Sequence, residues 1–287
     1  MKPKETINLY RVISLLVIAL VTSGVTGGLC AKSHLYPDEW LSMFFLTLIF
    51  LLACMFELEY ERKQKGISAN TQTTFIRLSV TYTVSGGLIY AISYLPEFYR
   101  PVMIPVILLT AVSNSMVAVS FGLFFDLVLA LTVGGSFYAL AAYMMLTMLA
   151  AVLAQALKEK KYRMGVSLLT FFFSLMIPEL FSYLSTKEMQ KYSLLYAFGT
   201  AFLTFLTAAF LFHRLLHEAD QEIENHLLDI VSEDYSEVKA LKDFSMVEYR
   251  HAVKVSDIAC RCAKEVGYRA NLCLAGGFYY RMGRWIG

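Results

Sequence analysis

Seven long apolar runs, separated by short charged segments, dominate the first 212 residues of this 287-residue chain. A helix needs roughly 20 apolar residues to cross a hydrocarbon core of about 30 Å. The pattern therefore predicts an all-α fold, a polytopic helix bundle embedded in a lipid bilayer. The runs lie near Val12–Cys30, Trp40–Phe56, Phe75–Leu95, Val102–Gly134, Phe137–Leu157, Gly165–Leu184 and Ser193–Phe212.

The fourth run is 33 residues long, about 50 Å as one helix, which is too long for an ordinary crossing. The polar triplet Ser113-Asn114-Ser115 lies near its middle, where a tight helical hairpin could leave two crossings of about 15 to 18 residues each. With that turn the bundle has about eight transmembrane helices, and both ends of the bundle lie on the same side.

Basic residues orient this bundle, because cytoplasmic loops carry an excess of Lys and Arg. Four basic residues are left for the outer loops, Lys32, Arg100, Lys187 and Lys191. We therefore expect both termini in the cytoplasm. The cytoplasmic side then holds ten basic residues, namely Lys2, Lys4, Arg11, Arg62, Lys63, Lys65, Lys158, Lys160, Lys161 and Arg163.

Charge is concentrated at the end of the chain, where His213–Gly287 holds 22 of the 48 charged side chains. This imbalance predicts a transmembrane domain over residues 1–212 and a cytoplasmic helical tail over 213–287. Charged residues make up 17% of the whole chain, against about 25% in soluble proteins, which argues against a water-soluble enzyme. No basic stripe with interleaved aromatic residues is present, so we expect no nucleic-acid partner.

Polar residues inside the apolar runs are the usual indicators of a transport path. Asp126 and Glu179 could form a proton or cation relay, and in a transporter or channel Asn114 would line the path with them. The alternative is that Asp126 pairs with another helix or caps the hairpin, and that Glu179 lies near the outer interface. We favour the alternative, because two isolated carboxylates without a cationic or repeated partner are weak evidence for a transport path.

The tail predicts four helical segments: an amphipathic connector, a short helix over Tyr235–Lys242, a helix over about Met246–Val266, and a last one from about Asn271. Asp243-Phe244-Ser245 is a plausible N-terminal cap for the third, and Gly267 stands where a left-handed cap ends it. One face of the third helix is expected to point toward a core, and it carries His251, Val255, Ile258, Ala259, Cys262 and Val266.

Five cysteines, an odd number, do not form a disulfide framework. Cys30 and Cys54 lie in apolar segments, and Cys260, Cys262 and Cys273 lie in the tail. We interpret the tail thiols as small buried side chains, because Cys-x-Cys on a helix points its two thiols about 200° apart and makes a poor zinc pair.

The tail resembles the start of an HD-type phosphohydrolase domain. The match covers the run from Glu248 to Ala259 (EYRHAVKVSDIA), then Glu265-Val266-Gly267, and then the run from Leu274 to Arg284 (LAGGFYYRMGR). The chain is most similar to the seven-transmembrane HD phosphodiesterases, bacterial membrane proteins that hydrolyse cyclic di-AMP. The resemblance implies that residues 213–287 are a connector plus a partial HD-like domain, and that the protein lies in the bacterial inner membrane.

The family uses two divalent metal ions, Mn or Fe, held by His and Asp side chains. His251 falls on the family's first metal-binding histidine, but Tyr280-Arg281 occupies the position of the defining His-Asp doublet. A guanidinium cannot coordinate a cation and a phenol is a poor substitute for imidazole. We therefore expect no catalytic residue and no metal cofactor in this chain as given, and Arg281 could instead hold a phosphate by bidentate hydrogen bonds.

The resulting hypothesis is a membrane protein with a degenerate HD portion that acts in signalling or regulation, with a cyclic dinucleotide as candidate ligand and a homo-oligomer as candidate assembly. Three alternatives stay open. The chain could be a transporter or channel, a scaffold whose tail binds a partner helix, or a fragment of a longer HD phosphohydrolase.

Overall fold

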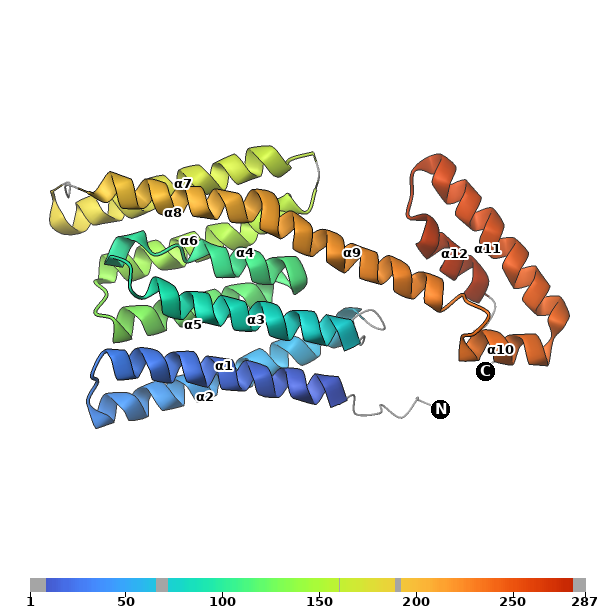
Figure 1. The fold of residues 1–287 in the computed structure, drawn as a ribbon, viewed down its shortest axis with the longest axis horizontal. Coiled ribbons are helices and arrows are strands. Elements are labelled where there is room, and N and C mark those ends of the chain that lie inside the picture. The colour runs from blue at the N-terminus through green and yellow to red at the C-terminus, as the bar shows by residue number, and fades with distance from the viewer. Residues whose placement is uncertain (1–8, 66–71, 160, 189–191, 281–287) are drawn as a thin grey trace. The chain divides into compact units, whose positions relative to one another are not determined.

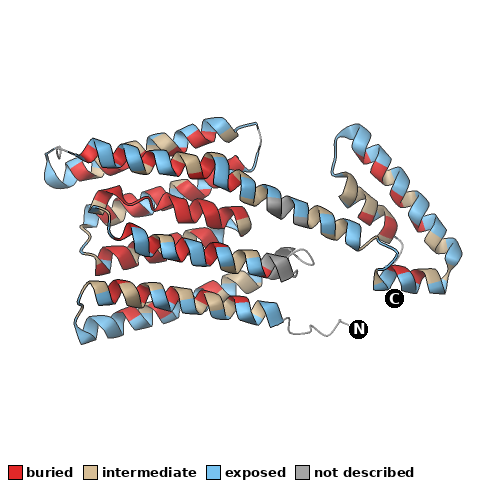
Figure 2. Cartoon of the chain, in the orientation of Figure 1, coloured by how far each residue is buried: buried red, intermediate tan, exposed pale blue. Residues whose placement is uncertain are grey.

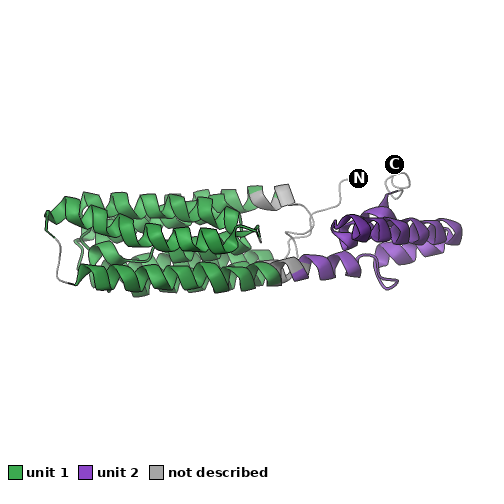
Figure 3. Cartoon of the chain, turned by 90° about the horizontal axis from the view of Figure 1, so that it is seen from above, with its two compact units in different colours: residues 1–217 green, residues 218–287 purple. Residues whose placement is uncertain are grey.

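The computed structural model describes residues 9–65, 72–159, 161–188 and 192–280, and within these ranges all regular structure is helical. The chain divides into two compact units, residues 1–217 and 218–287 (Figure 3). The predicted domain boundary, after residue 212, falls a few residues earlier. The predicted and observed boundaries differ because the chain is helical without a break from Ser193 to Asp229. The apolar run therefore ends inside a helix and not at a turn.

Unit 1 is a bundle of helices connected by short loops (Figure 1). Figure 1 shows the start of α1 and the end of α8 at the same end of this bundle. Its elements are α1 (Leu9–Lys32), α2 (Pro37–Lys65), α3 (Gln72–Ile92), η2 (Glu97–Tyr99), α4 (Met103–Val112), α5 (Ser115–Thr132), α6 (Phe137–Leu157), α7 (Arg163–Thr186), α8 (Ser193–Leu206), the π-helical turn η3 (Thr207–Leu211), and the first part of α9 (Phe212–Asp229).

Seven helices in the described ranges are long and apolar enough to cross a bilayer, as judged by length and composition. They correspond to six of the predicted runs and to the second half of the fourth, so the prediction of a helical multi-pass membrane protein is confirmed at this level. The helix α4 is not among the seven, because its 10 residues span only about 15 Å.

The fourth run breaks at the predicted place. Ser113 ends α4 in an extended conformation, and Asn114 precedes α5 as its N-cap residue. Ser113 donates two hydrogen bonds to the carbonyl of Leu109, from its backbone N–H at 2.8 Å and from its hydroxyl at 3.1 Å, and these close the last turn of α4. The first half is therefore shorter than the crossing that the sequence predicts.

The core of unit 1 is built around α4. Every residue from Met103 to Ala111 is buried, and α4 packs against α3, α5 and α6. Figure 2 shows the buried residues of unit 1 concentrated on these central helices. A glycine permits the closest approach, because a Cβ on Gly122 would lie 2.6 Å from the Thr147 methyl carbon of α6 and 2.7 Å from a Val106 methyl carbon of α4.

Unit 2 contains the rest of α9, then α10 (Ser236–Phe244), α11 (Met246–Val266) and α12 (Ala270–Tyr279). Its small core is formed by Val238 and Leu241 of α10, Ala252 of α11 and Phe278 of α12. The caps of α11 are as predicted. The Ser245 hydroxyl accepts a hydrogen bond from the Glu248 amide, and Gly267 ends the helix with a φ of 73°.

Candidate functional site

The packing of α11 against α12 positions the candidate site in the tail. A Cβ on Gly277 of α12 would lie 2.9 Å from the Ser256 Cα of α11 and 3.1 Å from the Ala259 Cβ. Glycine at this position therefore lets the two backbones approach more closely than any larger residue would allow. The carboxyl end of α12 consequently lies beside the first turns of α11.

This arrangement brings His251 and Tyr280 together. His251 Nε2 and the Tyr280 hydroxyl oxygen are 2.8 Å apart, and the tautomer of the imidazole decides which of the two donates. The ring centroids are 6.2 Å apart, and both residues are exposed. Arg281, the predicted phosphate-binding residue, lies outside the described residues.

The predicted core face of α11 is wrong at most of its positions, although Val255 and Ala259 are half-buried. Ile258 and Val266 are 62% and 82% exposed, and His251 is exposed as well. The physical reason is the close contact with α12, which places small side chains, not large apolar ones, between the two helices. The buried residues of α11 are Ala252, Ser256, Cys260 and Ala263.

Cysteine burial also departs from the prediction. Cys260 is buried as expected, but Cys262 is exposed and Cys273 is intermediate. Cys260 and Cys262 face different ways, as their spacing requires. Within the described ranges, no group of three or more His, Cys, Asp or Glu side chains is placed to hold a metal ion.

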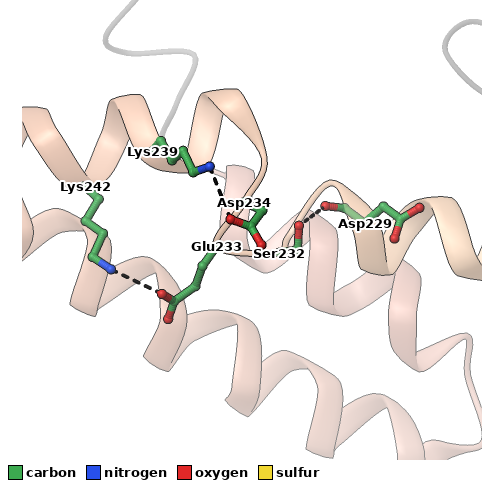
Figure 4. Close-up of polar contacts among 6 residues, drawn as sticks. All are labelled: Asp229, Ser232, Glu233, Asp234, Lys239 and Lys242. Atoms are coloured by element: carbon green, nitrogen blue, oxygen red, sulfur yellow. Dashed lines mark hydrogen bonds and ion pairs between the residues drawn. The ribbon is translucent and has the colours of Figure 1, made fainter.

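Polar contacts connect the turn between α9 and α10 to α10 (Figure 4). Lys242 Nζ lies 3.2 Å from a carboxylate oxygen of Glu233, and Lys239 Nζ lies 3.2 Å from a carboxylate oxygen of Asp234. The Tyr249 hydroxyl of α11 donates to the other Glu233 oxygen at 3.2 Å. The hydrogen bond from Lys242 is the main cause that lowers the pKa of Glu233 below its ordinary value.

The residue before Tyr280 also helps to place it. The Tyr279 hydroxyl donates a hydrogen bond to the carbonyl of Ile230, which follows α9. Burial raises the pKa of this phenol to about 12. At the other end of α12, Arg269 Nη2 lies 3.1 Å from a Glu224 carboxylate oxygen of α9. Both ends of α12 are therefore hydrogen-bonded to α9 or to the residue that follows it.

The polar residues predicted to line a membrane path are held by different partners. Asp126 is 1% exposed and accepts a hydrogen bond from the Thr147 hydroxyl of α6 at 2.7 Å. Its second oxygen has no hydrogen-bond partner among the described residues. Glu179 instead accepts from the Tyr99 hydroxyl at 3.4 Å, and Asn114 lies about 18 Å from Asp126 along α5.

Among the described residues of unit 1, the most deeply buried cation is one whose burial the sequence does not predict. Arg100, expected in an outer loop, is 4% exposed. Its guanidinium donates to the Leu95 carbonyl at 3.3 Å and to the Tyr143 hydroxyl at 3.2 Å, and Tyr143 donates to the Glu97 carbonyl. No sequence signal marked this burial, because a charge between Pro96 and Pro101 is typical of an exposed loop.

The fold and these contacts define a helical multi-pass membrane protein with a compact helical tail. Compared with protein-family models, with curated proteins and with solved structures, the chain gives no match. The resemblance to the HD phosphodiesterases therefore rests only on the residues quoted in the sequence analysis.

Proposed function

We propose that this chain is a multi-pass protein of the bacterial inner membrane, with both termini in the cytoplasm, whose tail is a degenerate HD-like module that acts in signalling or regulation without turnover. One observation carries the proposal, the 2.8 Å contact between His251 Nε2 and the Tyr280 hydroxyl. If the resemblance holds, these are the positions of the first metal-binding histidine and of the doublet. The contact between them supports the assignment of both positions to one site.

The chemistry at these positions differs from that of a hydrolase. A dinuclear centre activates water with two cations held by imidazole and carboxylate groups. When the Tyr280 hydroxyl donates to His251, the imidazole lone pair that a metal would take is already occupied. With the charge of Arg281 next in sequence, the position favours an anion over a divalent cation. A cyclic dinucleotide is the candidate ligand, bound and not cleaved.

Metal binding and turnover test this proposal together. The purified 287-residue chain incubated with Mn²⁺ and cyclic di-AMP should form no linear product, and calorimetry should show no tight Mn²⁺ site. The double variant Tyr280→His with Arg281→Asp should bind Mn²⁺ at least about tenfold more tightly than the unaltered protein, because it adds an imidazole beside His251 and a carboxylate at the next position in the sequence, and both groups bind divalent metal ions.

Tyr268→His is the matched control, because Tyr268 is 65% exposed and the variant adds a histidine away from His251. It should bind Mn²⁺ as weakly as the unaltered protein. Metal-dependent hydrolysis by the unaltered protein would contradict the proposal, as would equal Mn²⁺ affinity in the double variant and the control. Titration with cyclic di-AMP then separates a ligand sensor, which gives heat, from a scaffold, which gives none.

A transporter or channel is the second candidate, and the unpartnered oxygen of Asp126 is the observation in its favour. An unsatisfied carboxylate inside a membrane domain is costly and often marks a substrate or ion path. Asp126→Asn should abolish flux in a liposome assay under this alternative. Unchanged flux would remove Asp126 from any pathway.

A further inference from the structure

A cavity of about 470 Å³ lies in unit 1 among α2, α5 and α6. This volume is within the range of about 300–1,000 Å³ that small-molecule sites occupy. Glu57, Ser115, Ser120 and Gln155 supply its polar groups, and apolar side chains that include Met148 and Val152 line the rest. The cavity therefore has the amphipathic lining of a site for a molecule with a polar head and an apolar body.

The polar groups are organised around one unsatisfied carboxylate oxygen. Ser120 Oγ donates to Glu57 Oε1 at 2.8 Å, and Gln155 Nε2 donates to Ser115 Oγ at 2.8 Å. Glu57 Oε2 is buried and has no hydrogen-bond partner among the described residues. A buried carboxylate oxygen without a donor is unfavourable, so the site lacks a group that can donate a hydrogen bond, and a cationic donor fits it best.

The polar and apolar parts of the cavity lie at different membrane depths. Glu57 and Gln155 are within three residues of the ends of the spans Pro37–Tyr60 and Phe137–Leu157, and Ser115 begins the span Ser115–Thr132. These positions lie within about 5 Å of the span ends, where lipid headgroups begin. Met148 lies two turns deeper along α6, at the level of acyl chains.

Access to the cavity is from the bilayer. Met116, Met148 and Val152, all lining residues, are 67%, 54% and 68% exposed. Apolar side chains exposed on a membrane-spanning helix face hydrocarbon. A ligand that arrives through this opening therefore comes from the lipid phase.

We propose that this cavity binds a membrane lipid whose headgroup carries a primary ammonium, such as an aminophospholipid. The Glu57 side chain turns its buried Oε2 toward the cavity and accepts a hydrogen bond from the ammonium, and the upper part of an acyl chain lies along Met148 and Val152. The quaternary ammonium of a choline lipid has no N–H and cannot make this hydrogen bond. At the same end of the bundle, the chain from the end of α6 to the start of α7 carries Lys158, Lys161 and Arg163. Their positive charge is complementary to a lipid phosphate.

Lipid retention measured on the full chain tests the proposal. Protein in nanodiscs containing equal phosphatidylethanolamine and phosphatidylcholine is released, and the bound lipids are counted by native mass spectrometry. The unaltered protein should retain phosphatidylethanolamine over phosphatidylcholine by about tenfold, the value of one charge-assisted hydrogen bond. Glu57→Gln should bring this ratio close to one. Equal retention of the two lipids by the unaltered protein overturns the proposal without any variant.

Glu159→Gln is the matched control, because Glu159 is an exposed carboxylate just beyond the same end of α6. It removes the same charge and should keep the selectivity, and loss of selectivity in this control would contradict a role for Glu57. Val152→Trp should lower phosphatidylethanolamine retention by filling the opening, and an exposed position tolerates the larger side chain. Retention of free dodecylamine with no preference between the two lipids would also overturn the proposal, because the source would then not be a lipid.

Discussion

Alanine substitution at two adjacent glycines of α12 should have opposite effects on the tail. A Cβ on Gly277 would lie 2.9 Å from the Ser256 Cα, whereas a Cβ on Gly276 would have no atom within 4 Å. Both substitutions gain about 1 kcal/mol of helix propensity. Only Gly277→Ala must push α12 away from the backbone of α11, an overpacking that costs about 1–3 kcal/mol.

The propensity gain is common to both variants, so the difference between them isolates the steric cost. Hydrogen exchange of the α11 and α12 amides, measured by mass spectrometry on the full chain in nanodiscs, reports the local opening free energy. A difference of about 1–3 kcal/mol corresponds to exchange that is about 5 to 150 times faster in Gly277→Ala than in Gly276→Ala.

The same displacement should act on the candidate site, because Tyr280 follows α12 directly. The Tyr280 hydroxyl should move out of hydrogen-bond distance of His251 in Gly277→Ala and stay in place in Gly276→Ala. The NMR shifts of the His251 imidazole would show the difference. Equal exchange rates in the two variants would refute the close packing of α11 and α12, and with it the geometry of the site.

Three further predictions concern burial and pH. Arg100→Met should destabilise unit 1 by about 1.5–3 kcal/mol, because hydrogen bonds from a charged donor are lost, and Tyr143→Phe should destabilise it less. Melting temperatures measured in detergent should rank the two variants in this order. Equal melting temperatures for the two variants would contradict the contact between Arg100 and Tyr143. Gly122→Ala should cost about 1–3 kcal/mol by overpacking α5 against α4 and α6, read as a fall in melting temperature, and a rise would contradict the close approach. The pKa of Glu233 is lower in the folded than in the unfolded state, so Glu233 should stabilise the α9–α10 turn at neutral pH, and this contribution should vanish as pH falls through the folded pKa. In Lys242→Met, an NMR titration should find the pKa of the Glu233 carboxylate back in its ordinary range. An unchanged titration would exclude Lys242 as the cause of the lowered pKa.

Most of the membrane domain could be predicted from the sequence, because the length of an apolar run is set by bilayer thickness alone. The break at Asn114 could be predicted for the same reason, since a run of that length cannot cross once. The burial of Arg100 could not. A charge flanked by prolines between two apolar runs looks like a loop, and only the packing of η2 against α6 and α7 shows that the segment lies inside the bundle.

The buried face of α11 could not be predicted, because the most apolar side chains of this helix are not the ones that are buried. Hydropathy selects Ile258 and Val266, the larger side chains, but a helix that packs against Gly277 must present small ones. Ser256 and Ala252 are buried because they are small. A rule based on size complementary to a glycine in the partner helix would have found this face, but the pairing of α11 with α12 has to be known first.

The closeness of His251 and Tyr280 is a consequence of this packing and not its cause. A hydrogen bond between two exposed side chains contributes at most about 1.5 kcal/mol, too little to hold two helices together. The distance is instead set by the backbone contact at Gly277 and by the bonds of Tyr279 and Arg269 to the connector. The frame for a two-residue site therefore exists whichever side chains occupy positions 251 and 280. Introducing metal ligands at these positions would change only side chains, whereas a larger residue at position 277 would move α12 away from α11.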